Sequence, residues 1–136
     1  MPLDKAFALY EAGDRAGARA LAEQILLTAS GNAEALHLLA VIAQDENRQA
    51  GAEDFARRAL SVAPGQSLYL NTLGNGLAAQ GRSAEAIAML EDAVKAAPSQ
   101  ADIMFNLAKA VENTSIFEKG RTTSLHLLVA PIRRAH

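Results

Sequence analysis

Glu34 and His37 come closer to a metal-binding motif than any other residues of this sequence. Their E-x-x-H spacing places a carboxylate and an imidazole on one face of a helix, as in carboxylate-bridged metal bundles. Such a site needs a second pair from another helix, and the other histidines, His126 and His136, lie in an irregular C-terminal segment. We therefore expect no metal ion, and we interpret His37 as a residue that lines a surface or is half-buried.

The sequence contains no set of residues that supports catalysis or a bound cofactor. Gly74, Gly76 and Gly81 resemble a phosphate-binding loop only superficially, because no strand precedes them and no Lys-Ser/Thr pair follows. The serines and threonines lack a histidine partner in register, and the carboxylates of Glu91 and Asp92 fall on a solvated helix surface. The chain has no cysteine, which removes thiol nucleophiles and thiolate metal sites. We expect a protein that is not an enzyme and has no cofactor.

The bulk composition favours one helical domain. The 136 residues are enough for a single core, and 50% of them are apolar while only 4% are aromatic, which is typical of close-packed helices. A formal net charge of −2 leaves no broad positive surface for nucleic acid. Charged residues interrupt the amino terminus, and no apolar stretch reaches the roughly 20 residues that span a membrane. We expect no nucleic-acid binding, no membrane insertion and a cytoplasmic location.

The strongest feature of the sequence is a period of 34 residues. The apolar pattern of residues 33–66 recurs in register over residues 67–100. The first copy has the positions Leu39, Ala40, Ala52, Ala59 and Pro64. The second copy has Leu73, Gly74, Ala86, Ala93 and Pro98, with Gly81 at a turn. A repeat of this length is a stacked unit whose hydrophobic face is buried by its neighbours.

Each copy contains two segments with helical spacing of apolar residues. In the first copy one stripe covers residues 36–43 and a second covers residues 52–60. Pro64 ends the second helix, because proline cannot continue one. A small residue such as Gly74 allows paired helices to approach closely, whereas a large side chain there would overpack the contact. The pattern predicts stacked pairs of helices.

Residues 33–100 resemble two complete repeats of the tetratricopeptide repeat family, and the second copy has the clearer pattern. It has the family's series of large and small residues, with Gly81 at the turn: Leu70, Leu73, Gly74, Leu77, Ala86, Leu90, Ala93 and Pro98. Leu36 and Leu70 stand where an aromatic residue is common, and Ala43 stands where tyrosine is usual. The resemblance implies an all-α fold, a right-handed superhelical solenoid of antiparallel helix pairs with about 3 to 4 repeats.

Extended in both directions, the period predicts a single domain over residues 1–136. It predicts a partial repeat over 1–32, complete repeats over 33–66 and 67–100, and a degenerate repeat over 101–136. The first helix of the last repeat should run through Met104, Leu107, Ala108 and Val111. From Asn113 onward the pattern decays. Three interpretations stay open there: a degenerate helix that Pro131 ends, a different cap or contact with another molecule, and a fragment of a longer protein.

The resemblance also implies where a partner would bind. In similar proteins the first helix of each pair lines a concave groove. The inward positions of this sequence are Phe7, Tyr10, Glu34, His37, Val41, Gln44, Asn71, Asn75, Asp102, Phe105, Asn106 and Lys109. Acidic residues outnumber basic ones there, and the lysine and arginine set that holds the terminal carboxylate of chaperones in similar proteins is missing. We expect a neutral to basic partner, whose backbone the asparagines would bind.

The sequence therefore favours a non-catalytic scaffold that binds a peptide or helix of a partner protein in its groove. A first alternative is the amino-terminal repeat region of a larger enzyme, such as a glycosyltransferase or sulfotransferase, because the stretch EALHLLAVIAQ resembles such regions. A second alternative is a self-assembling module that forms a homo-oligomer through the C-terminal segment.

Overall fold

The computed structural model describes residues 2–114, and all regular structure within that range is helical. The helices are α1 (Pro2–Glu11), α2 (Arg15–Thr28), α3 (Ala33–Asp45), α4 (Gln49–Val62), α5 (Ser67–Ala79) and α6 (Ser83–Ala96). A further helix covers residues 101–114. The expected continuation of the last repeat over residues 115–136 lies outside the described residues.

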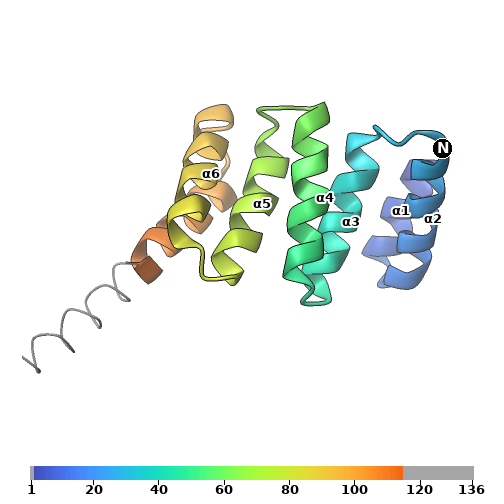
Figure 1. Cartoon of the computed structure of the whole chain (residues 1–136), viewed down its shortest axis with the longest axis horizontal. Coiled ribbons are helices and arrows are strands. Elements are labelled where there is room, and N and C mark those ends of the chain that lie inside the picture. Colours follow the sequence, from blue (N-terminus) through green and yellow to red (C-terminus); the bar gives the residue numbers. More distant parts are fainter. Residues whose placement is uncertain (1, 115–136) are drawn as a thin grey trace, which may run out of the picture.

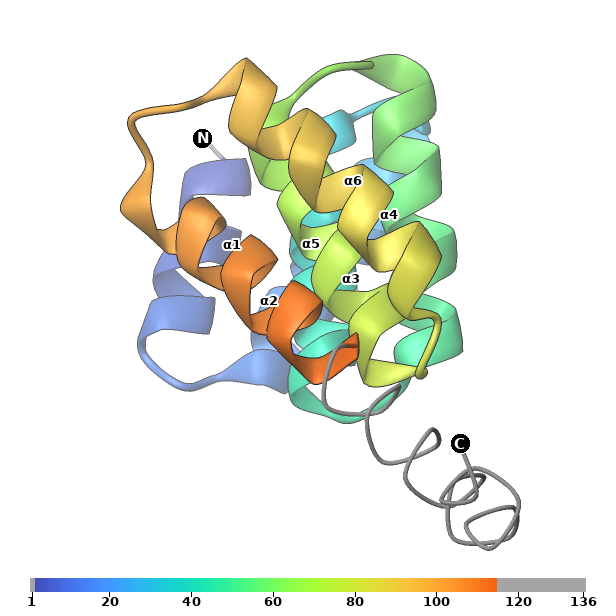
Figure 2. The ribbon, with the colours of Figure 1, turned by 90° about the vertical axis from the view of Figure 1, so that its left-hand side faces the viewer.

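The helices form antiparallel pairs that stand side by side in a stack (Figure 1). α1 packs on α2, α3 on α4 and α5 on α6, and successive pairs meet where α2 contacts α3 and α4 contacts α5. Seen along the stack, α4 and α6 lie on one side, whereas α1 and the helix over residues 101–114 lie on the other (Figure 2). This arrangement confirms the all-α solenoid of helix pairs that the sequence predicts.

The turn inside each pair repeats one backbone conformation. Gly13, Asn47 and Gly81 occupy equivalent positions and have positive φ angles of 93°, 60° and 77°. In the third pair the backbone N–H of Arg82 then donates to the carbonyl of Leu77 at 3.0 Å, which satisfies an end of α5. Asparagine tolerates the left-handed region better than most residues with a side chain, so it can replace glycine in the second pair.

Small residues let the paired helices approach closely. Ala40, Ala56 and Ala86 are fully buried and share one cluster with Leu73 and Leu77. Because each alanine adds only a methyl group to its helix surface, leucines from the neighbouring helix can fill the space above it. The core is therefore a series of such clusters, repeated from pair to pair.

Gly74 marks the tightest of these contacts. A Cβ atom built on Gly74 would lie 2.6 Å from Cγ of the buried Leu90 and 3.4 Å from the carbonyl oxygen of Ala86. The first distance is far inside van der Waals contact, and Cγ of a buried leucine cannot move freely. The backbone of α5 thus touches α6 directly at this residue.

The last helix buries a different face from the one that its sequence pattern emphasises. We expected apolar contacts through Met104 and Val111, but the buried residues are Ile103 and Ala110. Ile103 packs in a cluster with residues of α5 and α6. The helix over residues 101–114 therefore contacts the preceding pair, while the face that carries Met104 and Val111 is half-exposed among the described residues.

Replacement of Gly74 by alanine should destabilise the protein. The added methyl group collides with Leu90, and overpacking of this kind lowers the free energy of unfolding by about 1–3 kcal/mol. Gly51 in α4 is a matched control, because a Cβ there meets nothing within 4 Å. Gly51→Ala should stabilise the protein by roughly 0.5–1 kcal/mol. Urea denaturation measures both, and equal effects of the two substitutions would contradict the close contact at Gly74.

Candidate functional site

The predicted groove residues all lie on the first helix of a pair. Phe7 and Tyr10 belong to α1, and Glu34, His37, Val41 and Gln44 belong to α3. Asn71 and Asn75 belong to α5, and Asp102, Phe105, Asn106 and Lys109 belong to the helix over residues 101–114. We call the surface that these residues share the A-helix face. Because α1, α3, α5 and the last helix are consecutive in the stack, the A-helix face runs along its whole described length.

Polar side chains connect neighbouring helices of the A-helix face. The hydroxyl of Tyr10 donates to Oδ2 of Asp45 at 2.5 Å, across a separation of 35 residues. Nδ2 of Asn106 donates to Oδ1 of Asn71 at 3.0 Å, also 35 residues apart. A separation of one period plus one residue places the two side chains on adjacent helices that face each other. Several predicted groove residues therefore hold the stack together as well as line its surface.

His37 makes the corresponding contact between α3 and α5. Its Nε2 lies 2.7 Å from Oγ1 of Thr72, again 35 residues away, and its ring lies 4.8 Å from that of Tyr69 at an angle of 38°. Burial lowers the pKa of His37 to about 4, because a charged imidazolium would lose its hydration there. The imidazole is therefore neutral at neutral pH and acts as a hydrogen-bonding partner of Thr72.

Gly76 has a role in the same junction that the sequence pattern did not reveal. Nε2 of Gln44 donates to the backbone carbonyl of Thr72 at 2.7 Å, so α3 reaches the backbone of α5. A Cβ on Gly76 would lie 3.1 Å from that Nε2 atom. The absence of a side chain at Gly76 thus leaves room for the Gln44 amide.

At the amino-terminal end of the A-helix face, a carboxylate charge is partly neutralised and two aromatic side chains are partly buried. Burial, followed by the hydrogen bond to Asp45, raises the pKa of Tyr10 to about 12. Nε of Arg15 lies 3.6 Å from Oδ2 of Asp45, which offsets the carboxylate charge. Phe7 packs against the cluster that contains Leu38. The side chains of Phe7 and Tyr10 therefore present only part of their surface to a partner.

A pocket of about 300 Å³ opens at the other end of the A-helix face. It lies between α5 and the helix over residues 101–114. Its lining consists of three asparagines, three alanines and one lysine: Asn75, Ala78, Ala79, Asn106, Lys109, Ala110 and Asn113. Three predicted groove residues, Asn75, Asn106 and Lys109, thus meet around one cavity. Phe105, two thirds exposed, lies on the same helix.

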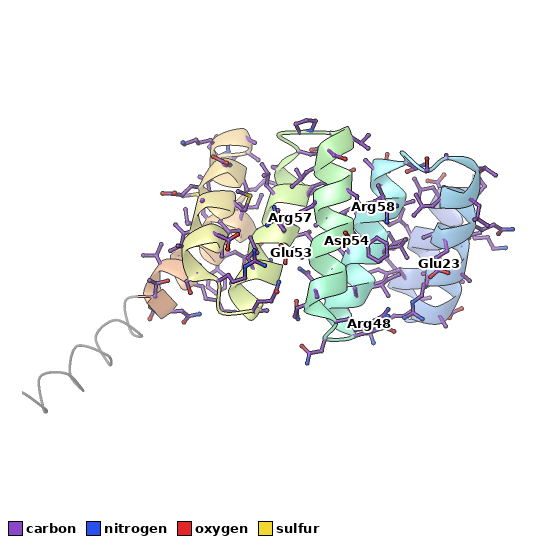
Figure 3. All side chains as sticks on the ribbon, in the orientation of Figure 1. Glu23, Arg48, Glu53, Asp54, Arg57 and Arg58 are labelled. Atoms are coloured by element: carbon purple, nitrogen blue, oxygen red, sulfur yellow. The ribbon has the colours of Figure 1, made fainter. Side chains whose placement is uncertain are left out.

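The opposite face of the stack carries charge pairs between the second helices. Oε2 of Glu53 accepts from Nε of Arg57 at 2.8 Å. Oε1 of Glu53 accepts from Nη1 of Arg82, the N-cap residue of α6, at 2.6 Å. Figure 3 shows Glu53 and Arg57 together on α4. The hydrogen bond from Arg57 lowers the pKa of Glu53. These charges are matched to one another, so this face offers no concentrated charge of one sign at α4.

Within residues 2–114, no group of three or more histidine, cysteine or acidic side chains could hold a metal ion. None of the helices in this range is long and apolar enough to cross a membrane.

Two models of the tetratricopeptide repeat match the sequence. One matches residues 33–66 and the other matches residues 71–122, so together they account for more than half of the chain. Among curated proteins none matches the chain.

Solved structures show the same fold. The chain is 29% identical to a mutant O-GlcNAc transferase of Thermobaculum terrenum, with a TM-score of 0.79 over 81% of this chain and 21% of the transferase. It therefore spans about a fifth of that enzyme. A tetratricopeptide domain of Sgt2 from Aspergillus fumigatus is 20% identical, with a TM-score of 0.78 over 88% of this chain and 80% of that one.

A third similar structure contains a ligand. It is the second tetratricopeptide domain of human RPAP3 in complex with the HSP70 peptide SGPTIEEVD. Its identity is 16% and its TM-score 0.74, over 80% of this chain and 91% of that one. At this level of identity the similarity shows a shared fold.

The buried His37 should make stability fall as the pH drops from 6.5 to 4. The unfolded chain takes up a proton near pH 6.5, whereas folded His37 does so only near 4, so acid favours the unfolded state in that interval. At about 1.4 kcal/mol per pKa unit, the loss approaches roughly 3 kcal/mol at pH 4.

His37→Gln is the control for this pH dependence. It removes the imidazole and leaves the other histidines in place, so the difference between the two proteins isolates His37. The free energy of unfolding, measured in urea between pH 7 and 4.5, should depend less steeply on pH in the variant. Parallel curves for the two proteins would show that His37 is not buried in its neutral form.

Proposed function

We propose that this chain, which belongs to the tetratricopeptide repeat family, is a non-catalytic scaffold that binds a segment of a partner protein on its A-helix face. The observation that carries the proposal is the pocket between α5 and the helix over residues 101–114. It gathers predicted groove residues around a cavity with room for part of a peptide. The affinity would come from a few contacts there, without chemical change of the ligand.

The asparagines supply the groups that an extended peptide needs. Asn106 uses its Nδ2 to donate to Oδ1 of Asn71, so Nδ2 of Asn71 and Oδ1 of Asn106 remain as one donor and one acceptor. A peptide unit offers the complementary carbonyl and N–H groups. Asn75 and Asn113 add further amides around the same pocket. The pocket therefore suits a polypeptide backbone, and we expect it to discriminate little between side chains of the ligand.

The two ends of the A-helix face differ in how many of their polar side chains form hydrogen bonds within the stack. Tyr10, His37 and Gln44 form hydrogen bonds within the stack, and these bonds would have to break before a ligand could use the same atoms. Asn75 and Lys109 make no side-chain hydrogen bond to any residue of the described range. Binding should consequently centre on α5 and the last helix.

The exposed side chains favour a partner that is apolar in part and neutral to basic. Phe105, which precedes the pocket residue Asn106 in the sequence, offers an exposed aromatic ring. Glu34 and Asp102 are exposed acids of the A-helix face, whereas Lys109 is the one exposed base among the residues that define this face. A ligand with apolar anchors and little negative charge would fit this balance.

Peptide binding by a similar fold supports the proposal. The human RPAP3 domain holds an HSP70 peptide on a chain that superimposes on this one with a TM-score of 0.74. That peptide, SGPTIEEVD, has acidic residues near its end. The A-helix face of this chain carries the exposed acids Glu34 and Asp102, so we propose a similar mode of binding with a preference for a different ligand.

A displayed library of random peptides tests the proposal with a defined probe. Peptides selected against the native chain should be neutral to basic and contain apolar residues. Asn75→Ala and Phe105→Ala should each weaken the binding of the selected peptides by about tenfold, measured by titration calorimetry. Asp54→Ala on α4 is the control and should leave the dissociation constant unchanged. Loss of binding in the Asp54 variant alone would place the site on the opposite face and contradict the proposal.

A second candidate is an amino-terminal repeat region of a larger enzyme. The observation that favours it is the 29% identity to an O-GlcNAc transferase, of which the match covers 21%. In that case the A-helix face would present partner proteins to a catalytic domain elsewhere in the protein. The complete reading frame around this sequence decides the matter: a transferase domain downstream would support the candidate, and a stop codon after His136 would exclude it.

A further inference from the structure

Leu68 is an exposed apolar residue at the start of α5. Its side chain is 50% exposed, whereas the three later leucines of α5 are at most 7% exposed. The residues one period before and one period after Leu68 are Glu34 and Asp102, and both are exposed acids. Equivalent positions of successive repeats lie side by side in a stack. Leu68 therefore stands between two carboxylates in one row across the first helices of the pairs.

Contacts between α3 and α5 support this placement on one side of Leu68. The ring of His37, one turn after Glu34, lies 4.8 Å from the ring of Tyr69, which follows Leu68 in the sequence. Burial, followed by the negative charge of Glu34, raises the pKa of Tyr69. The carboxylate of Glu34 therefore lies near the first turn of α5.

On the other side of Leu68, the last helix adds the second carboxylate and an aromatic ring. Ile103 packs in a cluster with Leu70, which holds the first turn of the last helix against the first turn of α5. Asp102 directly precedes Ile103. Phe105 lies one turn after Asp102, on the same side of the helix, and is 66% exposed. Two exposed apolar side chains and two acids thus share one area of the A-helix face.

The two carboxylates are not neutralised within residues 2–114. Neither Glu34 nor Asp102 forms an ion pair with another residue of that range. Both lie in the first turn of a helix, where a negative charge is favourable even without a basic neighbour. Glu53 on the opposite face is different, because two arginines pair with it. The charges of Glu34 and Asp102 are therefore available to a ligand.

We propose that this area binds a lysine or arginine side chain of the partner peptide. The methylene groups of that side chain would pack on Leu68, and its cationic group would lie between Glu34 and Asp102. The exposed ring of Phe105 would attract the same cation. We call these four residues the basic-residue subsite. The inference rests on the proposed function, since it assigns one side chain of the peptide that the pocket would hold.

The chemistry of the basic-residue subsite disfavours other side chains. Both carboxylates would repel an acidic side chain. A large apolar side chain would pack on Leu68 and Phe105, but it would displace water from the carboxylates without replacing the lost hydrogen bonds. A lysine or arginine covers the leucine with its methylene groups and keeps its charged end beside the acids. The subsite therefore selects for a basic residue.

The position of the subsite also indicates where the basic residue stands in the peptide. Leu68 and the pocket residue Asn75 are seven residues apart on α5. This separation corresponds to about 10 Å along the helix axis. An extended peptide covers that distance with about three residues. We expect the lysine or arginine about three positions away from the part of the peptide that enters the pocket.

A displayed library of random peptides, selected against the complete chain, tests the inference. The selected peptides should be enriched in lysine or arginine relative to the library. Selection against the double variant Glu34→Gln with Asp102→Asn should abolish this enrichment. Glu112→Gln is the matched control, because it removes an exposed acid at the other end of the last helix, and the enrichment should persist there. Equal enrichment against the native chain and the double variant, or none against either, would overturn the inference.

Titration calorimetry with a selected peptide and its norleucine analogue measures the role of the charge. Norleucine in place of the lysine keeps the methylene groups and removes the cation. The replacement should weaken binding to the native chain about fivefold at low salt. It should leave binding to the double variant unchanged, because the carboxylates that attract the cation are gone. An equal loss with both proteins would place the cation elsewhere and contradict the subsite.

The same peptides distinguish a failure of this inference from a failure of the proposed function. If Asn75→Ala weakens their binding while the double variant binds them as tightly as the native chain, the basic-residue subsite is wrong and binding at the pocket stands. If Asn75→Ala and Phe105→Ala both leave binding unchanged, or if no peptide is selected, the proposed function fails and the inference fails with it.

Discussion

The close approach of the two helices of a pair, with the backbone of one helix against a side chain of the other, is the constraint on which the rest of this structure depends. At Gly74 the approach of α5 to α6 leaves no space even for a methyl group beside Leu90. Alanines at the related positions, such as Ala40 and Ala86, allow similar approaches in the same cluster. Successive first helices also lie close enough for side chains 35 positions apart to form hydrogen bonds.

The polar contacts on that surface follow one geometric rule. Tyr10 with Asp45, His37 with Thr72 and Asn71 with Asn106 all join residues 35 positions apart. Each contact fixes the angle between two neighbouring helices, so the same side chains that could bind a ligand also hold the scaffold in shape. A binding surface of this kind is rigid, which reduces the entropy that is lost when a partner binds. The pocket beside Asn75 and Lys109 leaves space for a ligand on this surface.

Much of the fold could be predicted because the period records packing within a pair. The size pattern at Leu73, Gly74 and Ala86 is a property of two helices in contact, and those helices are adjacent in sequence. Contacts between successive pairs are less evident in the sequence pattern. The sequence predicts a half-buried or surface-lining His37, and the structure has it half-buried. The hydrogen bond of His37 to Thr72, the space that Gly76 leaves for Gln44 and the burial of Ile103 depend on residues in the neighbouring repeat, and single-helix periodicity does not contain that information. The sequence does not predict the positive φ angle of Asn47, because asparagine indicates such a turn less clearly than the glycines at the equivalent positions of the other pairs.

The central claim is that a partner binds along the A-helix face, centred on α5 and the last helix. Amide chemical shifts of the isotope-labelled chain, followed during titration with a peptide selected against it, test this claim most directly. The largest changes should fall on residues that line the pocket, such as Asn75, Asn106 and Lys109. Changes concentrated on α2, α4 and α6 would contradict it.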